Sequence, residues 1–258
     1  MDELKNCCAK IARLLFVALA GFLAVPAPAA YPLFVDDAGI TATRTSELDL
    51  FVDAARSSDS ELLAAYFSAT HGVFPGLELS LAWGFGWLHQ RTEDAPAHDG
   101  VLDLNVGFKA AIWDQTRHPC AVSFSLTSTI PTASARFGLG TGFTSLSALV
   151  LVTRDWGPLS LDFNGGYILT DIGHREKAAS DAGIAGVALR YQANQRLLLF
   201  VESFALLPVD SSQNATVVFR TGCQYQLSKS ILIGGAIGTG AGHGVVNEEA
   251  TLGLTLLF

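Results

Sequence analysis

The chain has 258 residues, half of them hydrophobic, and carries 24 acidic against 16 basic side chains, a formal net charge of −8. Proteins that bind nucleic acids present a basic surface to the phosphates, so this acidic balance argues against a nucleic-acid partner. After residue 30, no uninterrupted apolar run approaches the about 20 residues that a membrane-crossing helix needs. The composition therefore excludes a helical membrane protein, although it leaves membrane-crossing strands open.

The first 29 residues have the pattern of a secretory signal peptide. The stretch 1–13 is mildly basic, an apolar run follows from Leu14 to Val25, and small residues occupy positions 27, 29 and 30. A basic start, a short apolar run and an A-x-A site are the features of a segment that is removed on export. We expect residues 1–29 to be the signal peptide and residues 30–46, which show no sustained period, to be a periplasmic lead-in.

From residue 47 to residue 258, apolar and polar side chains alternate, which predicts β-strands with unlike faces. The clearest strand is 76–89, where Leu79, Leu81 and Trp83 alternate with smaller or polar residues such as Glu78 and Ser80. Further strands are expected at 47–53, 59–70, 101–112, 120–130, 141–154, 159–171, 181–192, 196–207, 215–226, 230–239 and 249–258.

The links between these segments separate two architectures, because alternation alone fits both a soluble sandwich and a membrane barrel. Short links of mostly three to six residues alternate with longer ones rich in Gly, Ala and charge, with 55–60 and 208–214 as shorter exceptions. Short turns at one rim and long loops at the other are typical of outer-membrane barrels. We therefore expect an all-β fold: a single transmembrane, antiparallel, up-and-down barrel of about 12 strands over residues 47–258, with both termini on the short-turn, periplasmic side.

Strand parity also predicts which polar side chains face the barrel lumen. This inward set is Asp49, Asp53, Glu78, Asp103, Asn105, Lys109, Asp162, Asn164, Arg190, Glu202, Arg220 and Gln224. Charges of both signs inside a barrel can line a conduit and set its selectivity, or they can pair into a network that plugs it. The sequence leaves both readings open.

No catalytic, cofactor or metal site is predicted. The six His residues form no H-x-x-x-H or H-E-x-x-H pair, and no G-x-S-x-G is present. Strand parity brings no His beside a Ser, as a barrel hydrolase would require. We therefore expect a protein that is not an enzyme and has no cofactor. A barrel enzyme that acts on lipids, and a closed structural barrel with functional loops, remain as alternatives.

Several segments resemble one family. They are 36–39 (DDAG), 130–132 (IPT), 138–142 (GLGTG), 161–167 (LDFNGGY), 222–228 (GCQYQLS) and 253–258 (GLTLLF). Together they resemble the outer-membrane β-barrel family named for transport in the phenol meta-cleavage pathway. The resemblance implies a porin-like channel in the outer membrane of a Gram-negative bacterium, surrounded by lipid, for passive uptake of small organic solutes, aromatic ones among them. Two departures are Leu257, where the family usually has a basic residue, and an acidic first strand.

The last ten residues alternate with a period of two, with Ala250, Leu252, Leu254, Leu256 and Phe258 on one face. A closing strand that ends in Phe is similar to the closing strands of bacterial outer-membrane barrels. That resemblance implies that the barrel-assembly machinery is a partner and reads this strand.

Overall fold

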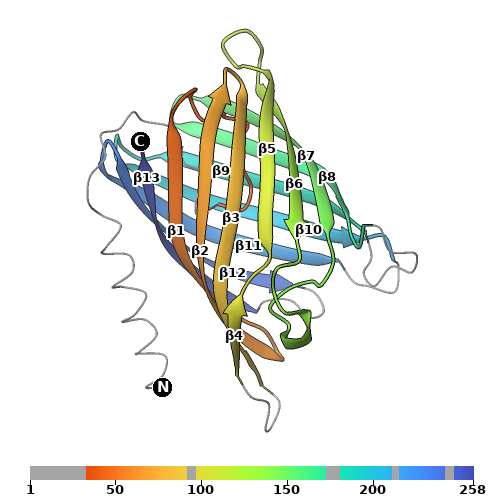
Figure 1. Ribbon diagram of the computed structural model, residues 1–258. Coiled ribbons are helices and arrows are strands. Elements are labelled where there is room, and N and C mark those ends of the chain that lie inside the picture. The colour runs from red at the N-terminus through yellow and green to blue at the C-terminus, as the bar shows by residue number, and fades with distance from the viewer. Residues whose placement is uncertain (1–32, 92–96, 173–180, 211–214, 242–246) are drawn as a thin grey trace.

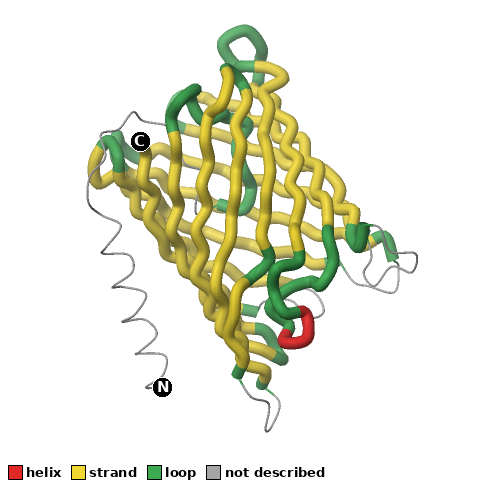
Figure 2. The backbone as a smooth tube through the Cα atoms, viewed as in Figure 1, coloured by secondary structure: helices red, strands yellow, loops and turns green. Residues whose placement is uncertain are grey.

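The computed structural model describes residues 33–91, 97–172, 181–210, 215–241 and 247–258, so the predicted signal peptide lies outside the described residues. The chain folds into one antiparallel sheet that closes on itself (Figures 1 and 2). Its strands are β1 (Ser46–Arg56), β2 (Ser60–Phe74), β3 (Leu77–Gln90), β4 (His98–Val101), β5 (Leu104–Trp113), β6 (Ala121–Ile130), β7 (Ser145–Trp156), β8 (Leu159–Leu169), β9 (Ala182–Gln192), β10 (Leu197–Pro208), β11 (Thr216–Ser228), β12 (Ile231–Ala241) and β13 (Glu248–Leu257).

Consecutive strands pair along the chain, except that β4 and β5 do not pair with each other, and β1 also pairs with β13, which closes the barrel. β4 and β5 both pair with β3 and together fill one position in the wall, so the thirteen strands build a closed wall of twelve. The predicted all-β, up-and-down barrel of about 12 strands is therefore confirmed. Among the described residues, no helix has the length and hydropathy to cross a membrane.

The two faces of the wall differ as the alternation predicts. On the outer face, Leu79, Phe163 and Leu252 are 50%, 55% and 71% exposed. On the inner face, Asp49 lies opposite Ser68 of β2 and Thr255 of β13, and its side chain is buried. Because an apolar surface of this extent around a closed sheet suits contact with hydrocarbon, the faces are those of a transmembrane barrel.

The two rims also differ. We call the rim at which β1 begins and β13 ends the short-turn rim, because its connections include Gly157–Pro158 and Lys229–Ser230. The opposite, long-loop rim carries the connection 131–144, which contains the 3₁₀-helix η1 (Ala135–Phe137). The alternation of short and long links in the sequence therefore corresponds to the two ends of the barrel.

The wall is interrupted at one place, between β4 and β5. The prediction of a continuous strand over 101–112 is wrong here, because Leu102 and Asp103 leave the ladder. The Leu102 side chain turns into the lumen and is 7% exposed. It fits there because Gly84 and Gly86 have no side chains: a Cβ at Gly86 would lie 2.9 Å from Leu102 Cδ2.

Candidate functional site

The lumen contains a stretch of the chain itself. Residues 33–45, which we call the N-terminal segment, enter the barrel and contact the inner faces of several strands before β1 begins. From the sequence, this stretch is expected to be a lead-in that precedes the barrel. It lies inside because polar side chains of the wall bind its backbone and its two aspartates, which satisfies polar groups on both sides.

The first contact of the segment is with β10 and β11. The Glu202 carboxylate accepts hydrogen bonds from the backbone amides of Phe34, at 2.9 Å, and Val35, at 2.8 Å. The Arg220 guanidinium lies 3.8 Å from the centre of the Phe34 ring and 3.1 Å from Glu202 Oε1. Arg220 also forms an ion pair with Glu249 of β13 at 2.7 Å. Charge-assisted hydrogen bonds thus hold Phe34 and Val35, and the cation–π contact holds Phe34 a second time.

The second contact involves the two adjacent aspartates. Lys109 of β5 donates to the Asp36 carboxylate at 3.0 Å and to the Asp37 carbonyl at 3.3 Å. Arg190 of β9 lies 3.1 Å from the Asp37 carboxylate. It also donates two hydrogen bonds, of 2.6 and 2.9 Å, to the carboxylate of Asp162 in β8. Because the two aspartates bind bases on different strands, they fix the segment across the width of the lumen.

The third contact anchors the rest of the segment through its backbone. Ala38 donates its amide to the Thr153 hydroxyl at 2.8 Å and accepts a hydrogen bond from the Ser123 hydroxyl at 2.6 Å. The Thr41 amide donates to Glu78 at 2.5 Å. Next to β1, the carbonyl of Ala42 packs against Gly72 of β2, where a Cβ would approach it to 2.1 Å. A glycine is therefore required at position 72 for the segment to lie against the wall.

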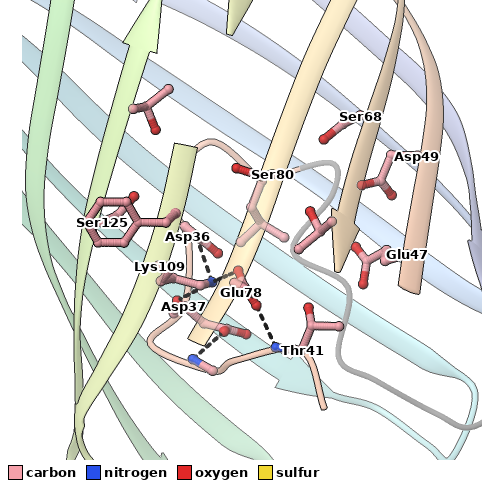
Figure 3. A pocket seen from close by; sticks show the side chains of 15 residues that line it. Asp36, Asp37, Thr41, Glu47, Asp49, Ser68, Glu78, Ser80, Lys109 and Ser125 are labelled. Atoms are coloured by element: carbon pink, nitrogen blue, oxygen red, sulfur yellow. Dashed lines mark hydrogen bonds and ion pairs between the residues drawn. The ribbon is translucent and has the colours of Figure 1, made fainter. Parts of the chain in front are cut away.

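A polar cavity of about 240 Å³ remains between the N-terminal segment and the wall. Its lining joins segment residues such as Asp36 and Thr41 to the inner faces of β1, β2, β3, β5 and β6 (Figure 3). Five carboxyl groups line this cavity, together with a single amine, that of Lys109, and several Ser and Thr hydroxyls. The five carboxyl groups belong to Asp36, Asp37, Glu47, Asp49 and Glu78.

At the long-loop rim, the connection 131–144 folds inward. The Asp103 carboxylate holds it by accepting hydrogen bonds from the backbone amides of Ala133, at 3.1 Å, and Thr141, at 2.8 Å. Leu139 of the same loop packs with Leu102 and Ala64 in a small buried cluster. The lumen is thus lined by polar groups beside the N-terminal segment and by apolar groups beside this loop.

Most of the predicted lumen residues come together around the N-terminal segment. Those whose side chains contact it or pair with a residue that does are Glu78, Lys109, Asp162, Asn164, Arg190, Glu202 and Arg220. The others lie elsewhere on the inner face. Asp49 borders the cavity, Asp103 holds the loop, and Asn105 accepts a hydrogen bond from Thr129 at 2.7 Å. Asp53 lies opposite Thr251 in the register, and Gln224 is 7% exposed.

Other side chains on the inner face are not in the predicted inward set. Glu47 lies within the expected strand 47–53, has the same parity as Asp49 and is buried beside it, so the parity rule applied to that whole strand would have found it. Glu249 could have been found by the same rule, since Thr251 and Thr255 share its face. Asp36 and Asp37 gave no periodic signal because they belong to no strand.

One contact corrects a statement made from the sequence. The Ser46 hydroxyl and His71 Nδ1 lie 2.8 Å apart, across the β1–β2 pair at the short-turn rim. The expected start of the first strand at 47 left out Ser46, so parity could not bring the two together. Within the described part of the chain, no group of three or more His, Cys, Asp or Glu side chains is arranged to hold a metal ion.

Comparisons with known proteins agree with this geometry. A family model described as "Putative MetA-pathway of phenol degradation" matches residues 36–258. An outer membrane channel of Pseudomonas putida has a similar fold, with a TM-score of 0.69 at 13% identity over 84% of this chain and 97% of that one. The NanC porin gives a TM-score of 0.59 at 12% identity, over 81% of this chain and 98% of the porin.

The translocator domain of the autotransporter NalP from Neisseria meningitidis is also similar in fold, with a TM-score of 0.52 at 10% identity, over 84% of this chain and 89% of that domain. A comparison with curated protein sequences gives no match. At such low identities these structures establish the barrel fold alone. Because the family model covers the whole barrel and most of the N-terminal segment, the chain belongs to the family described as "Putative MetA-pathway of phenol degradation".

Proposed function

We propose that this protein is a channel in the outer membrane of a Gram-negative bacterium, for passive uptake of small organic solutes, aromatic ones among them. In this proposal both termini lie on the periplasmic side, and the N-terminal segment occupies the path in the state described here. The observation that carries the proposal is that the lumen accommodates a peptide segment. A lumen that admits a backbone with its side chains is wide enough for a small organic molecule once that segment moves.

The nature of the contacts supports a segment that can leave. The wall closes through its own strand ladder, without the segment. The segment is bound chiefly through side chains that bridge to its backbone or its two aspartates, and its described backbone pairing with the wall is confined to the region of Thr43, Arg44 and Thr45 beside Gly72. Such contacts can be exchanged for water without opening the barrel.

The lining of the lumen supports organic solutes as the cargo. Apolar side chains of Leu62, Tyr66 and Leu88 surround the buried cluster beside the loop 131–144. Sites for small organic ligands are mostly apolar, with a few polar groups that orient the ligand. Relatives in fold that are named as channels or porins lend support to the same reading.

The predicted inward residues would set selectivity in this proposal. When the N-terminal segment withdraws, Glu78, Lys109, Arg190 and Glu202 lose their partners on it and face the open path. In outer-membrane barrels, substitutions in the lumen tune selectivity. These side chains would thus hold the segment in one state and contact the solute in the other.

Single-channel conductance in a planar bilayer tests the proposal. The chain from residue 30 and a variant that also lacks 30–41 are refolded, and phenol is added to one side. We expect rare openings with the segment present, steady openings without it, and block of both by phenol. A folded barrel that stays silent in both forms, and passes no phenol into liposomes, would overturn the channel.

A barrel enzyme that acts on lipids is a second candidate, because Ser46 and His71 form a hydrogen-bonded pair at the rim. Catalytic Ser–His pairs normally include a third group that orients the imidazole. Among the described residues, no acidic side chain bonds to His71, so the pair lacks that group. The test is hydrolysis of phospholipid in mixed micelles. This candidate requires activity that the substitution Ser46→Ala abolishes.

A further inference from the structure

The ring of Phe34 lies in a site on the inner wall that is built for an aromatic group. The Arg220 guanidinium covers one face of the ring, 3.8 Å from its centre. The ring of Phe204 on β10 stands at 90° to it, with 5.1 Å between the two ring centres. Cation–π contacts and edge-to-face ring pairs both require an aromatic partner, because they depend on the charge distribution of the π system.

A hydrogen-bond acceptor lies beside the ring. The backbone amide of Phe34 donates to both oxygens of the Glu202 carboxylate, at 2.9 and 3.1 Å. In phenylalanine, two carbon atoms separate the ring from this nitrogen. The wall therefore binds a ring together with a donor at a short, fixed separation from it. A small aromatic molecule with a hydroxyl or amide group on a two-carbon side chain presents the same two features.

Phe34 and its neighbour Val35 are held in different ways. Val35 is 2% exposed and packs against Gly186 of β9, where a Cβ would lie 2.9 Å from Val35 Cγ2. Phe34 is 52% exposed, so part of its ring is open to solvent. Val35 thus has the burial of a structural anchor, whereas the site around the Phe34 ring is accessible from one side.

The wall residues of this site belong to the barrel and do not depend on the segment for their positions. Glu202 and Phe204 lie on β10, and Arg220 lies on β11. The Arg220 guanidinium pairs with Glu202 at 3.1 Å and with Glu249 at 2.7 Å, and the Arg220 side chain is 1% exposed. Withdrawal of Phe34 would uncover the face of a guanidinium that carboxylates still hold in place. A site fixed in this way loses little conformational freedom when it binds a ligand.

We infer that Arg220, Phe204 and Glu202 form a binding site for a neutral aromatic molecule with a hydrogen-bond donor on a short side chain, and that Phe34 occupies this site as the protein's own ligand. The solute and the N-terminal segment then compete for one position on the wall. Because each excludes the other, the segment weakens binding of the solute and the solute weakens retention of Phe34. The inference rests on the proposed channel function, since it gives the solute a defined place in the same lumen.

Equilibrium dialysis of radioactive 2-phenylethanol tests the inference. This probe is neutral and carries its hydroxyl at the same separation from the ring as the Phe34 nitrogen. The protein is the refolded chain from residue 30 in detergent, and uptake by protein-free micelles is subtracted. Two variants vacate the site: Phe34→Ala removes the ring, and deletion of 30–41 removes the segment. The matched control is Phe163→Ala, which removes a ring of similar exposure, 55%, from the outer face.

We expect saturable binding in both vacated variants, at least about tenfold tighter than in the unsubstituted chain, where Phe34 leaves the site free for only part of the time. The control should match the unsubstituted chain. In the Phe34→Ala chain, the further substitution Phe204→Leu keeps the apolar bulk but loses the ring pair, and should weaken binding at least about threefold.

Two competitors separate the features of the ligand without changing the protein. 2-Cyclohexylethanol keeps the hydroxyl but has no π face for Arg220, so it should displace the probe at least about fivefold less well than unlabelled 2-phenylethanol does. The methyl ether of 2-phenylethanol keeps the ring but has no donor for Glu202, and should be about tenfold weaker.

Absence of saturable binding in both vacated variants would overturn the inference. Equal displacement by 2-phenylethanol and 2-cyclohexylethanol would overturn it as well, because it would reveal an apolar hollow without preference for a ring. The measurement needs no open pore. A silent barrel that binds the probe would therefore refute the channel and leave this site standing, whereas a conducting barrel without ring-selective binding would refute the site alone.

Discussion

The guanidinium of Arg220 lies 3.8 Å from the centre of the Phe34 ring, so that a buried wall residue stacks on the start of the N-terminal segment. The same guanidinium forms ion pairs with Glu202 and Glu249. Glu202 in turn binds the amides of Phe34 and Val35. Stability of the wall and retention of the segment therefore depend on one cluster of charges.

The substitution Arg220→Met removes the cation of this cluster. It leaves Glu202, 4% exposed, and Glu249 without their base. Breaking a buried ion pair by removing one partner costs about 3–5 kcal/mol, because an uncompensated charge remains buried. We expect a loss of that order in the free energy of unfolding, measured by urea titration of the barrel in lipid vesicles with Trp fluorescence as the signal.

Arg56→Met is the matched control. Arg56 also contacts two glutamates, Glu61 and Glu248, but all three side chains are about half exposed or more. Exposed ion pairs contribute about 0–1 kcal/mol each. Equal losses in the two variants would contradict the assignment of Arg220 to a buried cluster.

A second prediction concerns the fit of the N-terminal segment against Gly72. A methyl group there would lie 2.1 Å from the Ala42 carbonyl oxygen and 2.5 Å from that of Thr41, far inside contact distance. Overpacking of this kind costs about 1–3 kcal/mol, and the segment is the part that can move. We expect Gly72→Ala to raise the open probability of single channels in planar bilayers.

The control for Gly72→Ala is Gly165→Ala. Gly165 also lies in a strand, but a Cβ built there meets nothing within 4 Å. A change in open probability in both variants, or in neither, would show that the segment does not control the opening.

Much of the wall could be predicted from the sequence because strand parity is a local property. The expected strand 76–89 corresponds to β3 at Leu77–Gln90, and 159–171 to β8 at Leu159–Leu169. The same parity placed Glu78, Asp162 and Glu202 on the inner face. Each such assignment needs only the side chains of one strand, since successive residues point to opposite faces.

The contents of the lumen could not be predicted in this way. Asp36 and Asp37 have no period, and their partners Lys109 and Arg190 lie far along the chain. Which base meets which carboxylate depends on register between distant strands and on the path of an irregular segment. The break at Leu102 was hidden for a related reason: it depends on the space above Gly84 and Gly86, on the neighbouring strand.

A third prediction concerns the loop 131–144. Asp103→Ala removes the acceptor of three hydrogen bonds, from the amides of Ala133 and Thr141 and from the Thr141 hydroxyl. Hydrogen bonds to a charged group are worth about 1.5–3 kcal/mol each, so the loop should detach. We expect trypsin to cleave after Arg136 much faster in liposomes that contain the variant, as measured by mass spectrometry of the fragments.

Asp99→Ala is the control for the loop, because Asp99 is an exposed acidic side chain of the adjoining β4. Its loss should leave the cleavage rate unchanged. Resistance of the Asp103 variant to trypsin would mean that the apolar contacts of Leu139 suffice to hold the loop in place.

The last prediction concerns the seam at which the barrel closes. Phe258 and Ser46 exchange two backbone hydrogen bonds, of 3.0 and 2.6 Å, at the point where β13 meets β1. Deletion of Phe258 removes both bonds and the aromatic residue that the assembly machinery is expected to read. We expect a large fall in the folded fraction in isolated outer membranes, scored by heat-modifiable migration on gels. Phe74→Ala, which truncates a 62% exposed aromatic residue at the same rim, should assemble normally.

If the Phe258 deletion refolds poorly from urea into lipid as well, the hydrogen bonds of the seam are the cause. If it refolds normally in lipid but fails in cells, recognition by the machinery is the cause, and normal assembly in cells would contradict both explanations.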